Sequence, residues 1–204
     1  MRLVYRSVEL MTMDLAGAII RRGNEALCID VVSSYNCSHR LYTHNHPGHV
    51  PDAINGTYYS PFGGNVVKPG DGFTVGSFSV RAVNAYNITK LRNGTPIHPR
   101  GFGVGYLVNV DGITIYHMGD TDLIEDLTQL RNVKVDILLI PIGGVTVMTP
   151  EEAADAVMLL RPKIAVPIHF SDRRQFVKFR DIAQPYTQVI LTRELTTSKH
   201  NLFF

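Results

Sequence analysis

The sequence predicts a single α/β domain covering residues 1–204, rich in strands at first and alternating between strands and helices later. This prediction rests on two patterns and on the composition. Strand-like apolar runs dominate the first 142 residues, and capped helical patterns begin at Thr149. The 45% apolar and 19% charged residues are ordinary for a globular protein, and 204 residues suffice to bury a substantial core.

Strands and loops are expected in the amino-terminal half. Residues 8–21 and 26–32 are β-like runs joined by a turn at Gly23-Asn24. Residues 73–85 alternate apolar and polar side chains, as a half-buried strand does. The segment 45–71 is rich in Pro, Gly and Asn, which favours loops over helix.

A hairpin is the clearest local signal in the chain. Asp111-Gly112 separates the β-rich runs 105–110 and 113–117, which predicts a two-residue type I′ turn. The continuous apolar run 135–142 that follows is typical of a strand covered on both faces.

The clearest helix signals lie in the last third of the chain. Thr149 as N-cap, Pro150 in the first turn and Glu152 as capping-box partner predict a helix that ends near Leu160. The remaining predicted elements are a buried strand at 164–168, a helix near 172–183 and a last strand at 188–192.

The charge balance argues against several kinds of partner. The net charge is +2 and there is no run of Lys or Arg, so neither nucleic acid nor a membrane surface is expected as a partner. No stretch reaches the roughly 18 apolar residues of a membrane span, and charges interrupt the amino-terminal segment where a signal peptide would be apolar. These features favour the cytoplasm. A homo-oligomer is compatible with the sequence but not indicated by it.

The two cysteines do not form a disulfide framework. Cys28 lies in a predicted strand and is expected to be a buried thiol. Cys37 lies in a polar segment, where a metal-ligand or redox role is the less favoured alternative.

Residues 43–49 form the most informative segment, because they place His44, His46 and His49 within six positions. Imidazole is the commonest protein ligand for zinc and also suits iron. His44 and His46 are two apart, so on an extended segment they point to the same side. The Pro47-Gly48 turn can bring His49 back toward them. The cluster predicts a metal site, with a histidine-rich polar loop as the alternative.

Other predicted strand ends also carry groups suited to metal. His117 and Asp120 follow the hairpin, and His169 ends a buried strand, although alone it would suit a hydrogen-bonded core position. Asp120 is too early to cap the next helix, so its carboxylate is expected to have another partner. Asp122 and Glu125 have the spacing of an N-cap and its capping-box partner.

The order of these motifs resembles the metallo-β-lactamase superfamily. The resemblance extends over nearly the whole chain and includes the histidine cluster and the segments 116–122, 138–144, 148–154 and 166–169. These segments are most similar to a branch of small metal-dependent hydrolases like the ascorbate-6-phosphate lactonases. The resemblance implies a four-layer αββα sandwich of two mixed β-sheets, with the site at one edge.

The resemblance also implies a ligand set for two metal positions. One position would use His44, His46 and a downstream histidine. The other would use a motif aspartate, His49 and His169, with Asp120 bridging both.

This chain departs from the family pattern twice. Gly48 stands where the motif aspartate is expected, and Asn87 stands at the position of the downstream histidine. His98 lies nearby and is a candidate replacement, while Asn87 and His117 are further candidates for contact with metal or substrate.

A metal-dependent hydrolase of a small-molecule ester, lactone or phosphoester, using a metal-activated water, is therefore the leading hypothesis. The cofactor is expected to be one or two divalent ions, with zinc favoured over manganese or iron. Asp120 and His49 are the expected catalytic residues, and an anionic substrate would meet Lys90, Arg92 or Arg100. The alternative is a metal- or ligand-binding relative whose catalysis is impaired by the missing carboxylate.

Overall fold

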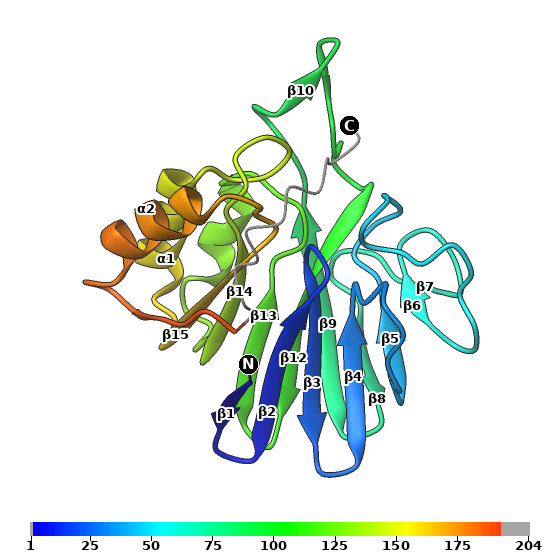
Figure 1. The fold of residues 1–204 in the computed structure, drawn as a ribbon. Helices are drawn as coiled ribbons and strands as arrows, with labels where there is room; N and C mark the ends of the chain where they lie inside the picture. Colours follow the sequence, from blue (N-terminus) through cyan, green and yellow to red (C-terminus); the bar gives the residue numbers. More distant parts are fainter. Residues whose placement is uncertain (1, 193–204) are drawn as a thin grey trace.

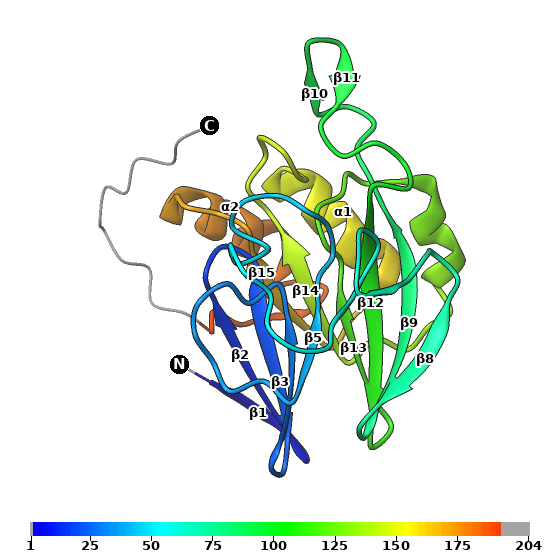
Figure 2. The same ribbon diagram turned by 90° about the vertical axis from the view of Figure 1, so that its right-hand side faces the viewer.

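The structure is a computed structural model that describes residues 2–192, and it is built on two mixed seven-stranded sheets packed face to face (Figures 1 and 2). The first sheet is antiparallel from β1 to β4 and parallel from β4 to β7. Its strands, in spatial order, are β1 (Leu3–Tyr5), β2 (Val8–Met13), β3 (Gly17–Arg22), β4 (Glu25–Ile29), β5 (His39–Leu41), β6 (Tyr59–Ser60) and β7 (Asn65–Val66).

The second sheet is parallel from β16 to β13 and antiparallel from β13 to β8. Its strands, in spatial order, are β16 (Gln188–Val189), β15 (Ile164–Ile168), β14 (Ile137–Pro141), β13 (Ile113–His117), β12 (Gly103–Val110), β9 (Phe78–Ala85) and β8 (Gly72–Val75). A separate hairpin of β10 (Leu91–Arg92) and β11 (Thr95–Pro96) projects beyond the sheets (Figures 1 and 2).

The main core fills the space between the sheets. Alternate side chains of each strand point inward, among them the fully buried Leu10, Ile20, Tyr106 and Ile115. The predicted β12–β13 hairpin is confirmed, since Asp111 (φ 50°) and its following glycine both have the positive φ that a type I′ turn requires.

The helices cover the outer face of the second sheet. They are η1 (Glu125–Leu130), α1 (Pro150–Leu160) and α2 (Arg173–Ala183), and they bury a second apolar cluster against that face. The predicted capping box of Thr149 and Glu152 is confirmed. Within residues 2–192 no helix covers the outer face of the first sheet, where a loop around Tyr35 packs instead on a small apolar cluster. None of the helices described has the length and apolar character needed to cross a bilayer.

Three predicted strands have different bounds in the structure. The run 8–21 is two strands, because Asp14 (φ 55°) turns the chain and accepts hydrogen bonds from the backbone N–H groups of Val32 and Ser33. The run 73–85 is also two strands, divided at Gly76 (φ 56°). The last strand ends at Val189 rather than at residue 192.

The prediction of a free thiol at Cys28 was wrong, because Cys28 and Cys37 form a disulfide. Parallel pairing of β4 with β5 places the segment before β5 alongside β4, and Ser38 N donates to Ala26 O at 2.9 Å. This register brings the two cysteines to a Cα–Cα separation of 5.8 Å. Disulfides persist in oxidising compartments, so this bond argues against the cytoplasmic location that the sequence favoured.

Candidate metal centre

The candidate residues meet at one edge of the sandwich, on loops that follow strands. Asp30 follows β4, the histidine cluster follows β5, Asp120 follows β13 and His169 follows β15. Because β4 and β5 are parallel, as are β13, β14 and β15, their carboxyl ends reach the same edge within each sheet. Rigid strands therefore hold the loops that supply the polar groups.

Asp120 lies at the centre of the group. Its Oδ2 lies 3.0 Å from His169 Nε2, 3.4 Å from His98 Nε2, 3.6 Å from His49 Nε2 and 3.7 Å from His44 Nε2. Burial raises the pKa of Asp120, but His169, His49 and His44 outweigh it and hold that pKa well below its usual value. Asp120 Oδ1 and His44 Nε2 are buried with no hydrogen-bond partner among the described residues.

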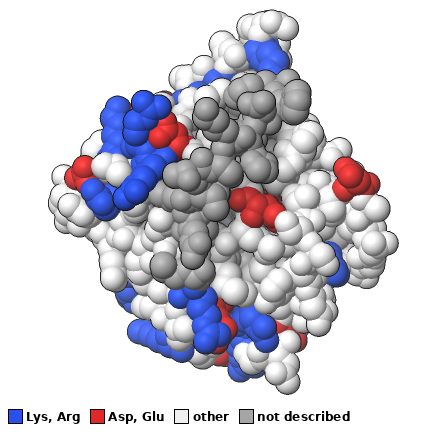
Figure 3. Space-filling view, in the orientation of Figure 1, with Lys and Arg blue, Asp and Glu red and all other residues white. Residues whose placement is uncertain are grey.

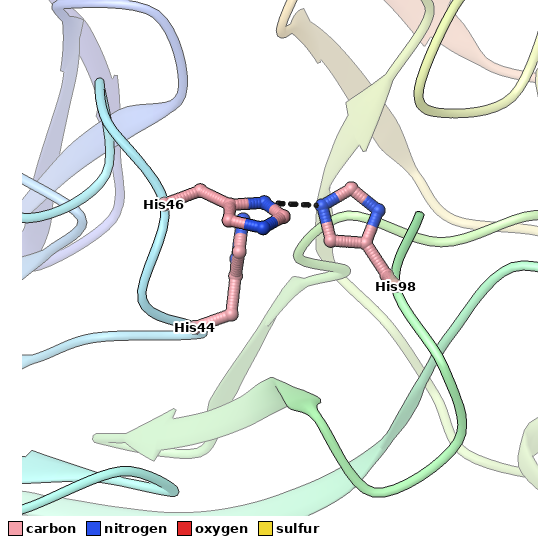
Figure 4. A group of neighbouring side chains, drawn as sticks. All are labelled: His44, His46 and His98. Carbon is pink, nitrogen blue, oxygen red and sulfur yellow. Dashed lines mark hydrogen bonds between the residues drawn. The ribbon is translucent and has the colours of Figure 1, made fainter. Parts of the chain in front are cut away.

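His44, His46 and His98 form one potential ligand group (Figure 4), with ring nitrogens within 4.8 Å of one another. His46 Nδ1 lies 3.0 Å from His98 Nε2. His98 therefore lies beside His44 and His46, as expected for the downstream histidine of the family pattern.

His49, Asp120 and His169 form the second potential ligand group, by the same 4.8 Å criterion. Gly48 contributes no side chain to it and has a φ of +89°, which L residues rarely adopt. A Cβ added to Gly48 would lie 3.5 Å from Leu15 Cδ2, so space is available but the backbone is unfavourable for aspartate.

Asp30, which the sequence analysis missed, orients two of the histidines. Its fully buried carboxylate accepts hydrogen bonds from Thr43 N at 2.7 Å, Thr43 Oγ1 at 2.5 Å and His49 Nδ1 at 2.8 Å. Since the Thr43 hydroxyl donates to Asp30, it accepts from His44 Nδ1 at 2.9 Å. Both rings thus carry their proton on Nδ1 when neutral, which leaves each Nε2 lone pair facing Asp120.

Asn87 orients His98 in the same way. Asn87 Oδ1 accepts from His98 Nδ1 at 2.7 Å, and its amide Nδ2 donates to Asp122 Oδ1 at 3.0 Å and Thr146 O at 3.1 Å. These donor bonds fix which end of the amide is the acceptor. Asn87 therefore supports His98 rather than facing the centre itself.

The predicted helix cap at Asp122 was wrong. Its Oδ2 accepts from the backbone N–H groups of Ile88 and Thr89, each at 2.7 Å, and η1 begins two residues later than such a cap requires. The carboxylate thereby ties the loop after β9 to the loop after β13, next to Asn87.

Burial and the two carboxylates set the protonation of the rings. Burial lowers the pKa of His98 to about 4 and that of His44 well below 6.5, with Asp120 opposing in each case. Both rings are therefore neutral, as a metal ligand must be. Burial also lowers the pKa of His49, but Asp120 and Asp30 together raise it to about 9. The position between these carboxylates thus favours positive charge.

Asp30 and His169 share an uncommon backbone conformation, with φ of 52° at each. Left-handed backbone is uncommon outside glycine, and such residues concentrate at functional sites. The turn between β2 and β3 helps to fix His169, whose N donates to Leu15 O at 2.9 Å.

His117 does not face the centre. It is fully buried, with Nε2 donating to Ala16 O at 2.8 Å and Nδ1 accepting from Gly119 N at 3.2 Å. Both ring nitrogens are already bonded, so the expectation of metal or substrate contact at His117 conflicts with the structure.

Lys90 and Arg100 are occupied elsewhere. Lys90 Nζ lies 2.5 Å from Glu152 Oε2 and 3.4 Å from Asp122 Oδ1. Arg100 pairs with Asp126 at 2.9 Å and lies over the ring of Tyr86. Neither lines the cavity at the centre, which is where a substrate was expected to meet them.

A cavity of about 350 Å³ opens at the centre. Asp120, His46, His49, His98 and His169 contribute to its lining. This size is at the lower end of the range for small-molecule sites, roughly 300–1,000 Å³.

A beta-lactamase superfamily domain matches residues 23–169 of this chain. The chain belongs to the beta-lactamase superfamily. It is 34% identical over 149 residues to a UPF0173 metal-dependent hydrolase of Thermococcus kodakarensis, covering 64% of this chain and 66% of that protein. A UPF0173 metal-dependent hydrolase of Caldivirga maquilingensis is 31% identical over 172 residues, covering 75% of this chain and 76% of that one.

The fold of this superfamily member has close counterparts among solved structures. A protein of Parabacteroides distasonis superposes with a TM-score of 0.81 at 23% identity, covering 94% of this chain and 96% of that one. This confirms the fold as two mixed sheets of the metallo-β-lactamase type. The matched part of the chain spans about two thirds or less of the length of the first curated relatives.

Proposed function

We propose that this chain is a metal-dependent hydrolase whose centre binds divalent metal between Asp120 and the surrounding histidines. The observation that supports it is the convergence of four histidine Nε2 atoms on one buried carboxylate. His44 Nε2 and Asp120 Oδ1 are buried without partners, and burying polar atoms unpaired costs about 1–3 kcal/mol each. A cation at the centre satisfies both atoms.

His44, His46 and His98, with Asp120, would hold one ion, and His49, Asp120 and His169 would hold another. Three protein ligands per ion are the usual number for catalytic zinc, and nitrogen and oxygen donors also suit iron and manganese. We favour zinc. A divalent ion bound here would polarise a carbonyl or phosphoryl oxygen and lower the pKa of a water.

The chain's own groups would position the reactants. Asp120 is ionised, so its carboxylate would bind the ion and also accept a hydrogen bond from a water beside it. Gly48 supplies no carboxylate beside the second group, so Asp120 and His49 are the side chains left to handle a proton there. His169, at the cavity wall, would lie next to the bound substrate.

A small ester, lactone or phosphoester is the proposed substrate class. The 350 Å³ cavity supports a small molecule rather than a polymer. The face of the molecule drawn in Figure 3 supports the same choice, because its Lys and Arg side chains form separate groups interspersed with acidic ones. A nucleic acid would require a continuous basic surface.

Metal analysis of the purified protein, joined to a panel of chromogenic esters, lactones and phosphodiesters, tests the proposal. We expect one to two equivalents of divalent metal, lost in the double variant His46→Ala/His169→Ala. His39→Ala is the matched control, because His39 lies near Glu25 outside the centre and its loss should leave the metal content unchanged. Wild-type protein that binds no metal after reconstitution would refute the hydrolase proposal.

The alternative is a relative with impaired catalysis, and Gly48→Asp addresses it. A large gain in hydrolysis would indicate a decayed enzyme. Because Gly48 has a φ of +89°, the variant's folding must be checked by thermal unfolding before a lack of gain is interpreted.

Two features of the chain favour different cellular locations. The sequence favours the cytoplasm, whereas the Cys28–Cys37 disulfide favours an oxidising compartment. Alkylation of free thiols in unfractionated cells distinguishes them, since protein held in a reducing cytoplasm would be labelled at both cysteines.

A further inference from the structure

Arg92 is the cation of the β10–β11 hairpin that lines the cavity at the metal centre. Its side chain has no ion pair or hydrogen bond with any residue in 2–192, in contrast to the paired side chains of Lys90 and Arg100. Burial lowers the pKa of His46, which lines the same cavity, and the charge of Arg92 lowers that pKa further. An arginine left unpaired at a cavity wall can bind an anion through two parallel N–H donors.

Apolar side chains line the cavity together with Arg92 and the histidines. Leu15, Ile97, Val145 and Phe170 line the same cavity. Val145 is 63% exposed, so one aliphatic side chain of this lining is accessible to solvent. Apolar surface of this kind favours an apolar ligand segment.

The two ends of the cavity differ in exposure and chemistry. Asp120 and its histidines form the buried end, with Asp120 only 4% exposed. Arg92 lies at the exposed end, on the hairpin that projects beyond the sheets (Figures 1 and 2). A ligand that satisfies both ends has two separated polar groups joined by an apolar segment.

We infer that the substrate carries a carboxylate, bound by Arg92, separated by a short apolar chain from the acyl group that reacts at the metal centre. Arg92 is then a specificity-determining residue that selects acidic over neutral substrates. The inference rests on the proposed function for the reacting end, but binding of the carboxylate can be measured without hydrolysis.

The test uses two inert amides that differ in one group, glutaric acid monoanilide and its neutral counterpart with a terminal carboxamide. Calorimetric titration into the metal-loaded protein measures each Kd. We expect the acid to bind about tenfold or more tightly than the amide in wild type, as a charge-assisted pair does. Arg92→Gln should remove that preference and Arg92→Lys should restore part of it.

Arg131→Gln is the matched control, because Arg131 is an exposed arginine next to η1, outside the cavity lining, and should keep the wild-type preference. Equal binding of acid and amide by wild type, or no binding of the acid at millimolar concentration, overturns the inference. A preference that survives in Arg92→Gln also overturns it, because the bound metal alone would then attract the carboxylate.

Hydrolysis of the matching 4-nitrophenyl esters separates this inference from the proposed function. Carboxylate preference without hydrolysis of either ester would leave Arg92 as an anion site and refute the hydrolase. Hydrolysis of both esters with no carboxylate preference would refute only the role of Arg92.

Discussion

Asp30→Asn is the most direct perturbation of the metal centre that leaves its ligands in place. Asn is, like Asp, tolerated in left-handed backbone, so the φ of 52° does not confound the substitution. The exchange is nearly isosteric and removes one acceptor oxygen. Its effect therefore reports on hydrogen bonding rather than on packing.

The expected effect follows from the three bonds that Asp30 accepts. Thr43 N occupies one oxygen, while Thr43 Oγ1 and His49 Nδ1 share the other. Either orientation of an asparagine amide places an N–H against a donor. The orientation that keeps the Thr43 N bond turns the amide N–H toward His49 Nδ1. The neutral ring, which is the form that binds metal, then carries its proton on Nε2, the atom that faces Asp120.

A protonated Nε2 cannot ligate metal, so the affinity of the second ligand group must fall. Loss of a partner that orients a ligating histidine typically costs about 10- to 100-fold in metal affinity, which is roughly 1.4–2.7 kcal/mol. We expect a loss in this range for Asp30→Asn, measured by competition with a chromophoric chelator. The melting temperature of metal-free protein, measured in parallel, shows whether the variant is folded.

Asp136→Asn is the control, because Asp136 is also a buried carboxylate but lies next to β14 at its amino end, at the opposite edge of the sheet. It should leave metal affinity unchanged. If Asp30→Asn binds metal as tightly as wild type, the orienting role of Asp30 is refuted.

Two further predictions concern stability. Burial raises the pKa of Asp136, but hydrogen bonds from Lys163 and from Thr114 N lower it below 3.8. The stabilisation that ionised Asp136 contributes is therefore complete above the pKa that this carboxyl has in the unfolded chain. It disappears as pH falls through the lower pKa of the folded protein. Urea unfolding should show Asp136→Asn destabilised by about 1 kcal/mol at pH 7 and by progressively less below pH 4; a constant difference would contradict the assignment. Cys37→Ser should lower the free energy of unfolding by about 2–3 kcal/mol for a loop of this length, and reductant should destabilise wild type but not the variant.

Sequence patterns predicted a structural feature correctly where all the residues that determine it are neighbours in the chain. The capping box of Thr149 and Glu152 and the turn at Asp111 are each specified within four residues, and both predictions are confirmed. The disulfide was missed because it depends on the register between β4 and β5, which no local pattern fixes. Asp122 had the right spacing for a cap, but backbone N–H groups of a distant loop compete for its carboxylate.

For the candidate metal centre, too, the sequence predicted some of the residues and missed others. The sequence and the family pattern named His44, His46, His49, Asp120 and His169, which the structure brings together. Asp30 was overlooked, although a carboxylate that ends a buried apolar strand was as visible a signal as His169 at the end of its strand. The roles of Asn87 and His98 could not be separated, because only the fold decides which of the two reaches Asp120.

The departure at Gly48 makes the two ligand groups unequal, and metal titration should reveal this. The first group offers three neutral histidines and a share of Asp120, whereas the second offers two histidines and the same carboxylate. The first ion should therefore bind more tightly and the second in a separate, weaker step. His98→Ala should weaken the tight step and His169→Ala the weak one, as measured by chelator competition. A single class of sites that both variants weaken equally would contradict this division, and would mean that the centre holds one ion shared across Asp120.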